Sequence, residues 1–444
     1  MRLYFDETAF VHEMDRVREK QFLKQVEAYD AQLAIIMRQQ GYHRIDSVER
    51  TVIFTFGEIT FRRNRWRKGQ TTRYPVDEWL GLTAYMRYSP EMVLHMAKHA
   101  SKMSYREVCR TIRDAYRLIV TKDAVLKAVK CVGELFSKKE RYRFYMENKE
   151  PQKMTVKRLY VEGDGVLVKT TSGGDNRQNT DIAHFMVHTG SEKVGNSHKR
   201  YGLENKHEIV HTNYEKAKEE LLDYLYNHFE ITDQTILITN SDNGTGYTKR
   251  AFKEIKDALG IKQHEHFWDA YHLNEKIHKF FKPYPLPLKE LMFKAIRTHH
   301  KSVMITVLDT VESLILSEEE MERYQRFRRK LVSNFKDTKP PKLRGLSSRG
   351  IGGMESQHRK VTYRMKNRGM YWSLKGAHAM ACLILLERID QLEELFFGEW
   401  RQQYALYEEN RFSAGYANHR TKSPPSIRTY KSGHKTGRWR TNAK

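Results

Sequence analysis

Residues 158–170 read RLYVEGDGVLVKT, and this stretch decides the fold. Its apolar side chains fall on both faces of an extended chain, which predicts a strand over 158–168 that is buried on both sides. Asp164 stands in the middle of this strand. A carboxylate there costs free energy unless it is paired or bound to a metal ion. Asp164 is therefore the first candidate for a functional residue.

Two further carboxylates stand at comparable places. Asp242 follows the β-branched run of the segment TILITNSDNG, and Glu355 lies in the glycine-led segment GIGGMESQHRKVTYRMKNRGMYWS. Taken singly, Asp164 can be a structural strand-end residue, Asp242 a turn residue and Glu355 a helix residue favoured by the helix dipole. Taken together, three carboxylates that converge from two strands and a helix would hold two divalent cations for displacement at phosphorus.

The elements around these residues alternate in a definite order. Three hairpin-connected strands are predicted first, followed by a helix, a strand, a helix and a strand: 158–168, 182–189, about 206–211, then 213–229, 235–240, 247–259 and 264–268. This order is the one expected of an α/β fold with a ribonuclease H-like core, which we place at 157–275 plus 345–398. A proline-rich break at 282–287 and helical periodicity beyond it predict a helical insertion over 276–344.

The N-terminal residues 1–150 follow a different pattern. Helical spacing over 16–40 precedes a predicted β-hairpin at 49–69, and the capped segments of 89–135 predict short helices. These helices form either a helix-turn-helix or a plain helical packing unit. A charged linker is expected at 137–153, and the polar, basic residues 413–444 predict a mobile tail.

The chain is strongly basic. Lys and Arg number 79 against 55 Asp and Glu, a net charge of +24, and the pI is about 9.7. Such an excess indicates a polyanionic partner, most often nucleic acid. The candidate phosphate-binding and stacking residues lie on the hairpin and on the Glu355 helix with its extension: Arg62, Arg63, Arg65, Trp66, Arg67, Arg359, Arg364 and Arg368. For the second group the alternative is a solvated charged face, but its place beside three carboxylates favours phosphate binding.

Several classes of protein are disfavoured. No apolar run reaches the roughly 18 residues of a spanning helix, and the N-terminus MRLYFDETAF lacks the features of a signal peptide. The 3 cysteines (Cys109, Cys131 and Cys382) have no CxxC spacing, which argues against a disulfide framework and a zinc ribbon. We therefore expect a cytoplasmic protein of a reducing compartment.

The residues around the three carboxylates resemble those of DDE transposases. The shared features are GDG at 163–165, SDNG at 241–244, WDAYHL at 268–273, ME at 354–355 and RMKNRGMYWS at 364–373. The spacings, 242 − 164 = 78 and 355 − 242 = 113, leave room for an inserted helical domain in the second interval. The likeness is to the ISLre-two family of bacterial insertion-sequence transposases and its Mutator-like relatives, over roughly residues 50–395.

This resemblance implies a function. Asp164, Asp242 and Glu355 would be catalytic and would hold two Mg²⁺ ions, with Mn²⁺ as a substitute, while Asp269 and His272 would handle DNA. The protein would bind the terminal inverted repeats of its element, cleave the ends and join them to target DNA, as a homo-oligomer on DNA. No membrane or small-molecule substrate is implied. The alternatives are a non-catalytic DNA-binding protein derived from a transposase and a structure-selective nuclease of the same fold.

Overall fold

The computed structural model describes residues 5–146, 153–172, 176–195, 201–347, 349–366 and 368–410. The chain divides into two compact units. The first contains Met1–Tyr142 and Cys382–Tyr407, and the second contains Arg143–Ala381 and Glu408–Lys444. The tail predicted at 413–444 lies outside the described residues.

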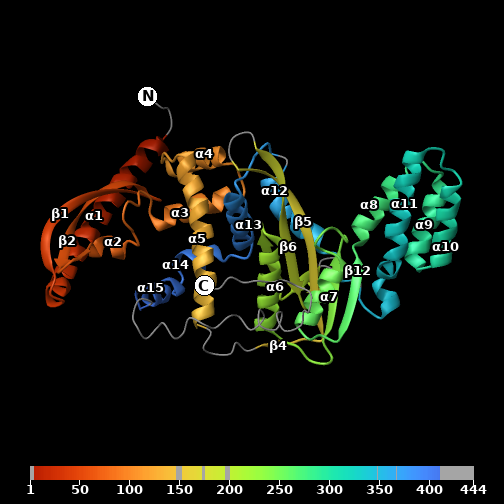
Figure 1. Cartoon of the computed structure of the whole chain (residues 1–444). Helices are drawn as coiled ribbons and strands as arrows, with labels where there is room; N and C mark the ends of the chain where they lie inside the picture. The colour runs from red at the N-terminus through yellow and green to blue at the C-terminus, as the bar shows by residue number, and fades with distance from the viewer. Residues whose placement is uncertain are drawn as a thin grey trace. The chain divides into compact units, whose positions relative to one another are not determined.

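A mixed five-stranded sheet forms the centre of the second unit. Its strands lie in the order β12 (Gln263–Trp268), β11 (Ile236–Ser241), β5 (Arg158–Thr171), β6 (Arg177–His188) and β9 (His207–His211). β11 is parallel to both β5 and β12, whereas β6 is antiparallel to both β5 and β9. The predicted order of three hairpin-connected strands, then helix, strand, helix and strand, is the observed order, and the fold is mixed α/β (Figure 1).

The two faces of the sheet are covered by different elements. Leu159 and Val161 of β5 belong to a core with residues of α6 (Tyr214–His228) and α7 (Lys249–Ala258). Tyr160 belongs instead to a cluster on the other face, with Leu346 and Ile351 of the segment before α12 (Met354–Met365). Because side chains alternate along a strand, Glu162 and Asp164 lie on the same face as Tyr160, and α12 contacts β5.

Helices with a core of their own follow β12. They are α8 (Ala270–Phe280), α9 (Leu286–Thr298), α10 (Lys301–Glu312) and α11 (Glu318–Ser333), followed by two 3₁₀ turns, Phe335–Thr338 and Pro341–Arg344 (Figure 1). Phe280, Ile296, Leu308 and Tyr324 contribute to their core. The first of these helices begins at Ala270, inside the segment predicted as sheet core, because the Asp269 side chain caps it.

Smaller elements of this unit have no counterpart in the sequence prediction. β7 (Gly190–Lys193) pairs with β8 (Tyr201–Glu204), and β4 (Met154–Thr155) pairs with β10 (Phe229–Glu230). These strands have 4, 4, 2 and 2 residues, which is too short for a periodic pattern to reveal.

The first unit combines a curved antiparallel sheet with helices. Helix α1 (Glu7–Gln39) lies along the sheet of β1 (His43–Phe54), β2 (Gly57–Lys68) and β3 (Thr71–Arg73), as Figure 1 shows. The remaining elements are α2 (Pro75–Trp79), α3 (Pro90–Ala100), α4 (Tyr105–Tyr116), α5 (Lys122–Met146), α14 (Leu392–Phe397) and α15 (Trp400–Asn410), with α13 (Leu374–Arg388) spanning the division at 381/382.

Two predicted boundaries need correction. The linker expected at 137–153 is helical as far as Met146, because no glycine or proline interrupts 137–146. The predicted core extended to 398, whereas Cys382–Tyr407 cluster with the N-terminal unit. Within that unit α14 contacts α3, and Lys98 of α3 donates to Glu393 of α14 at 2.7 Å. None of the helices in the described part of the chain has the length and apolar character needed to cross a membrane.

Candidate active site

The ends of two adjacent parallel strands bring two carboxylates together. The register pairs Asn240 of β11 with Glu162 of β5, so Asp242 and Asp164, each two residues further on, come level. Their side chains are 23% and 17% exposed. The two carboxylates are therefore partly buried, close enough to interact electrostatically, and still accessible from solvent.

Asp164 is surrounded by one backbone donor and two histidines. Its Oδ1 accepts a hydrogen bond from Gly165 N at 2.7 Å. Its Oδ2 lies 3.5 Å from His358 Nδ1 and 3.9 Å from His272 Nε2. Burial, together with the negative charge of Asp242, raises the pKa of Asp164 to about 6 against the lowering effects of the Gly165 hydrogen bond and of His272. The local environment therefore disfavours the charged form of this carboxyl group.

Asp242 occupies a tight turn directly after β11. Its Oδ1 accepts a hydrogen bond from Gly244 N at 2.6 Å, and a Cβ atom on residue 244 would lie only 2.7 Å from that oxygen. Lys276 Nζ donates to the Asp242 carbonyl oxygen at 3.2 Å and lies 3.8 Å from Oδ2. Burial, followed by the charge of Lys330, lowers the pKa of Lys276. Glycine at 244 thus lets the carboxylate fold back onto its own turn.

Asp269 and His272 form a hydrogen-bonded pair at the next strand end. The Asp269 N–H donates to the Ser241 carbonyl at 2.7 Å, and the Asp269 Oδ1 caps α8 by accepting from His272 N at 3.0 Å. The same Oδ1 lies 3.0 Å from His272 Nδ1, while Oδ2 accepts from Asn240 Nδ2 at 3.0 Å. The hydrogen bond with Asp269 raises the pKa of His272. His272 is therefore held with Nε2 directed at Asp164.

Glu162 was not singled out from the sequence, and it positions the third predicted carboxylate. It is 1% exposed and accepts hydrogen bonds from Gly352 N at 2.6 Å and Met354 N at 2.9 Å, at the start of α12. Burial raises its pKa to about 7, which those backbone donors oppose. A strand carboxylate thus takes the place of a helix cap for α12.

Glu355 lies in the first turn of α12. Its helix approaches Asp164 through His358, which is three residues further along and so on the same helical face. Among the described residues, however, no group of three His, Cys, Asp or Glu side chains is arranged to hold a metal ion. The structure brings together Asp164, Asp242 and His272, while Glu355 lies on α12 one helical turn before His358, which contacts Asp164.

Other charged groups near the pair were also missed from the sequence. Asp181 of β6 lies against Gly165, where a Cβ atom would come within 2.2 Å of its Oδ1, and burial together with the charge of Asp242 raises its pKa. Burial and the nearby His184 and His272 lower the pKa of His358 to about 3. The i, i+3 spacing of Glu355 and His358, and the i, i+4 spacing of His272 and Lys276, were the available signals.

Three of the residues predicted to contact DNA are buried. Trp66 is 0% exposed, Arg364 is 1% exposed with its guanidinium 5.2 Å from the Trp372 ring, and Arg63 is 9% exposed. The prediction that Trp66 stacks on a base is wrong for this conformation, because β2 directs the indole into the protein. Arg364 and Arg63 likewise cannot form part of an exposed phosphate-binding face.

The other predicted arginines remain accessible to different degrees. Arg62, Arg67, Arg359 and Arg368 are exposed. Arg65 is half-buried and paired with Asp46 at 2.5 Å. A phosphate-binding role remains a prediction for these five residues.

Comparison with known proteins places the chain in a family. The chain belongs to the uncharacterised protein family UPF0236, whose model matches residues 4–402. It is 30% identical over 369 residues to the Streptococcus gallolyticus protein described as "UPF0236 protein in vanSb 3'region", across 82% of this chain and 78% of that relative.

One solved structure is similar at a low level. The chain matches the Drosophila P element transposase strand transfer complex with 10% identity, 79% of this chain and 92% of that chain being covered, and a TM-score of 0.23. A TM-score this low does not establish a shared fold.

Proposed function

We propose that this protein is a DDE-type transposase, similar to those of the ISLre-two family. One observation carries the proposal. Two partly buried aspartates, Asp164 and Asp242, come level at the ends of adjacent parallel strands, where burial and the charge of Asp242 disfavour ionisation of Asp164. A local cluster of carboxylates is what a site for divalent cations requires. The net charge of +24 over the whole chain is what a polyanionic substrate requires.

The topology supports a ribonuclease H-like core. In the order β12-β11-β5-β6-β9, only β6 runs against the direction of the other four strands. Asp164 lies on the central strand and Asp242 directly after its parallel neighbour. This arrangement follows from the sheet alone and does not depend on the resemblance of short motifs.

The oxygen donors of this edge suit hard divalent cations such as Mg²⁺, or Mn²⁺ in its place. Asp164 and Asp242 would hold the ions, and Glu355 would complete one site from the first turn of α12. When bound, two such ions supply a nucleophile at neutral pH and stabilise the leaving oxygen of the phosphodiester.

The neighbouring side chains would orient the reacting groups. Asp269 fixes the His272 ring, and a proton on Nε2 would lie beside Asp164 and the DNA strand. Lys276, whose Nζ lies 3.8 Å from Asp242 Oδ2, partly offsets the negative charge before substrate binds. The exposed Arg359 and Arg368 would contact the DNA backbone near α12. In this proposal the arginines bind the DNA backbone, Asp269 orients the His272 ring, and His272 holds the proton.

The test uses the full-length chain and DNA from the flanks of its own gene. Terminal inverted repeats found there, joined to a labelled duplex, are incubated with Mg²⁺ or Mn²⁺. We expect cleavage at the repeat boundary and joined products with wild type, and neither with Asp164→Asn or Asp242→Asn. Asp114→Asn, an exposed carboxylate on α4 with 69% of its side chain accessible, is the matched control.

Each alternative function has its own outcome. Cleavage without joined products would identify a structure-selective nuclease of the same fold. Specific binding of the repeats without metal-dependent cleavage in either ion would identify a non-catalytic DNA-binding protein derived from a transposase. Cleavage that survives Asp164→Asn would remove the proposed site altogether.

A further inference from the structure

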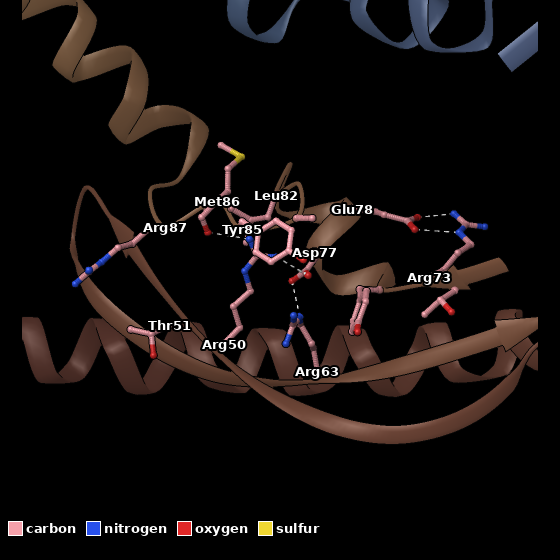
Figure 2. A pocket seen from close by; sticks show the side chains of 13 residues that line it. Arg50, Thr51, Arg63, Arg73, Asp77, Glu78, Leu82, Tyr85, Met86 and Arg87 are labelled. Atoms are coloured by element: carbon pink, nitrogen blue, oxygen red, sulfur yellow. Dashed lines mark hydrogen bonds and ion pairs between the residues drawn. The ribbon is translucent and has the colours of Figure 1, made fainter. Parts of the chain in front are cut away.

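The first unit contains a pocket of about 640 Å³ between β1, β2, β3, α2 and the loop that follows α2. Its lining includes four arginines and two carboxylates, so positive charge is in excess (Figure 2). We call it the arginine pocket, and its charged residues are Arg50, Arg63, Arg73, Arg87, Asp77 and Glu78.

The floor of the arginine pocket is a closed ionic network. Arg50 Nη1 lies 2.6 Å from Asp77 Oδ2, and Arg63 Nε lies 2.8 Å from Asp77 Oδ1. All three side chains are nearly inaccessible, at 10%, 11% and 8% exposure. The carboxylate of Asp77 offsets the charge of both guanidinium groups, and all three side chains are buried, so they build the pocket.

Arg50 also holds the turn that carries Tyr85. Its Nη2 donates to the carbonyls of Thr83 at 2.7 Å and Met86 at 2.8 Å. Between these two residues Tyr85 adopts a φ of 63°, a left-handed conformation that costs free energy for a residue other than glycine. Its side chain is fully exposed at 103%. The hydrogen bonds from Arg50 therefore hold a strained turn that exposes an aromatic ring to solvent.

The rim of the pocket holds two arginines in solvent-exposed ion pairs. Arg73 pairs with Glu78 and Arg87 lies 3.4 Å from Glu58, with the arginine side chains 39% and 69% exposed. Exposed ion pairs of this kind contribute little to stability. A phosphate group can therefore replace Glu58 beside Arg87 at small cost. At Arg73 it would compete with the two hydrogen bonds that Nε and Nη2 donate to Glu78, and Arg binds phosphate with two donors at once.

We propose that the arginine pocket binds one unstacked nucleotide of single-stranded DNA. The ring of Tyr85 stacks on the base, and Arg73 and Arg87, which lie at opposite ends of the pocket, bind phosphates of the same strand. This combination of an exposed ring with cations on either side is the arrangement that single-stranded nucleic acid requires. Only the choice of DNA as the polymer rests on the proposed function.

Other ligands fit the pocket less well. An apolar ligand would leave the rim arginines without partners, and a small inorganic anion would make no use of Tyr85. A base in an intact duplex offers no free face to a tyrosine ring, so the bound nucleotide is one that has left the stack. Tyr85 thus supplies the stacking residue that Trp66, which is buried, does not.

The test measures binding of the full-length chain to a short fluorescein-labelled oligothymidylate by anisotropy, in EDTA so that no cleavage occurs. We expect Tyr85→Ala to weaken binding about tenfold, and Tyr85→Phe to restore most of it, because stacking needs the ring and not the hydroxyl. The slope of log K against log salt should stay unchanged in both. Phe10→Ala, another exposed ring of the same unit, is the matched control and should bind as wild type.

The arginines give a separate readout. Arg73→Ala and Arg87→Ala should each reduce the salt slope by about 0.7, the value for one phosphate on a single strand. Arg326→Ala, an exposed arginine of α11, should leave the slope unchanged. Melting temperatures of all variants show whether the turn still folds.

Two results would overturn the proposal. One is wild-type affinity of Tyr85→Ala for the oligothymidylate, and the other is an equal loss on a blunt duplex of the same length. Tyr85-dependent preference for oligouridylate would assign the pocket to RNA instead. Failure here leaves metal-dependent cleavage untouched, and loss of cleavage in Asp164→Asn leaves binding in EDTA untouched, so the two proposals fail separately.

Discussion

Asp77 and Asp164 are both carboxylates with little solvent access, and the protein treats them in opposite ways. Asp77 receives two guanidinium groups at 2.6 and 2.8 Å. Asp164 receives one backbone N–H and otherwise faces two histidines and the charge of Asp242. In the first unit positive charge exceeds negative charge around the carboxylate, whereas in the second unit the carboxylates are in excess.

The difference is the one we expect between a structural carboxylate and the carboxylate of the proposed metal site. A buried charge that the protein neutralises itself holds elements together, and removing one partner leaves the other unpaired. A carboxylate whose pKa is raised to about 6 destabilises the folded state when it is ionised, and either protonation or a bound cation relieves this cost. The predictions below test this contrast, from the largest expected effect to the smallest.

The largest effect concerns the third member of the carboxylate site. Glu355→Gln should lower metal-dependent cleavage by about 10³-fold or more, and the triple variant with Asp164→Asn and Asp242→Asn should be hardly worse, because residues that act as a unit are not additive. Asp181→Asn should lower cleavage by only about 10–100-fold. Gel assays of end cleavage measure both. A larger loss of cleavage with Asp181→Asn than with Glu355→Gln would identify Asp181 as the third ligand in place of Glu355.

The second effect is on stability. Asp77→Ala should destabilise the N-terminal unit by about 3–5 kcal/mol, because it leaves two buried guanidinium groups unpaired. Asp164→Asn should leave stability unchanged or raise it, since it removes one of two like charges. Thermal denaturation followed by circular dichroism measures both.

Glu78→Ala is the matched control for Asp77→Ala. Its ion pair with Arg73 is exposed, so it should cost less than about 1 kcal/mol. Equal destabilisation by Asp77→Ala and Asp164→Asn would contradict the contrast between the two carboxylates.

The strong regularities of the sequence predicted the sheet well. The β5 segment, the β11 segment and the capped helices were predicted within a few residues because their apolar periodicity and start signals are local. The level positions of Asp164 and Asp242 then follow from parallel pairing. Whether they act as catalytic residues stays a prediction.

What local pattern could not reveal was side-chain direction and long-range anchoring. Trp66 lies among basic residues and reads as a stacking residue, but only the pairing of β2 with its neighbours directs it inward. Glu162 reads as one more polar residue in a strand, and its role depends on α12, which lies some 190 residues away in sequence. Such contacts are set by tertiary packing, and no window of the sequence contains both partners.

The third effect is a pH dependence with a defined sign. The pKa of Asp164 is raised from 3.8 to about 6, so the folded state binds more protons than the unfolded state between these values, and stability falls as pH rises through that window. The loss is about 2–3 kcal/mol. Glu162, raised from 4.5 to about 7, adds a loss of the same sign at slightly higher pH.

Melting temperatures of wild type and Asp164→Asn at about pH 4 and about pH 7 isolate the Asp164 part of this effect. The advantage of the variant should be larger at the higher pH. Mg²⁺ should raise the melting temperature of wild type at about pH 7 and leave the variant nearly unaffected, because binding to the folded state alone stabilises it. If the melting temperatures of the two proteins depend on pH in the same way, Asp164 is not the group whose ionisation destabilises the folded state.

The smallest effect separates the two roles of the Asp269–His272 pair. His272→Ala should lower cleavage by about 10–100-fold, the usual cost of losing a residue that orients a metal site, with little change in melting temperature. Asp269→Ala should cause the same loss of cleavage and an additional 1–2 kcal/mol of destabilisation, because Asp269 also caps α8 and accepts from Asn240.

Asp269→Asn keeps an oxygen for the helix cap but no longer carries the charge that raises the pKa of His272. It should therefore recover the stability without recovering the activity at neutral pH. If Asp269→Asn recovers both, the pair serves only to cap the helix, and the role of His272 in handling DNA is wrong.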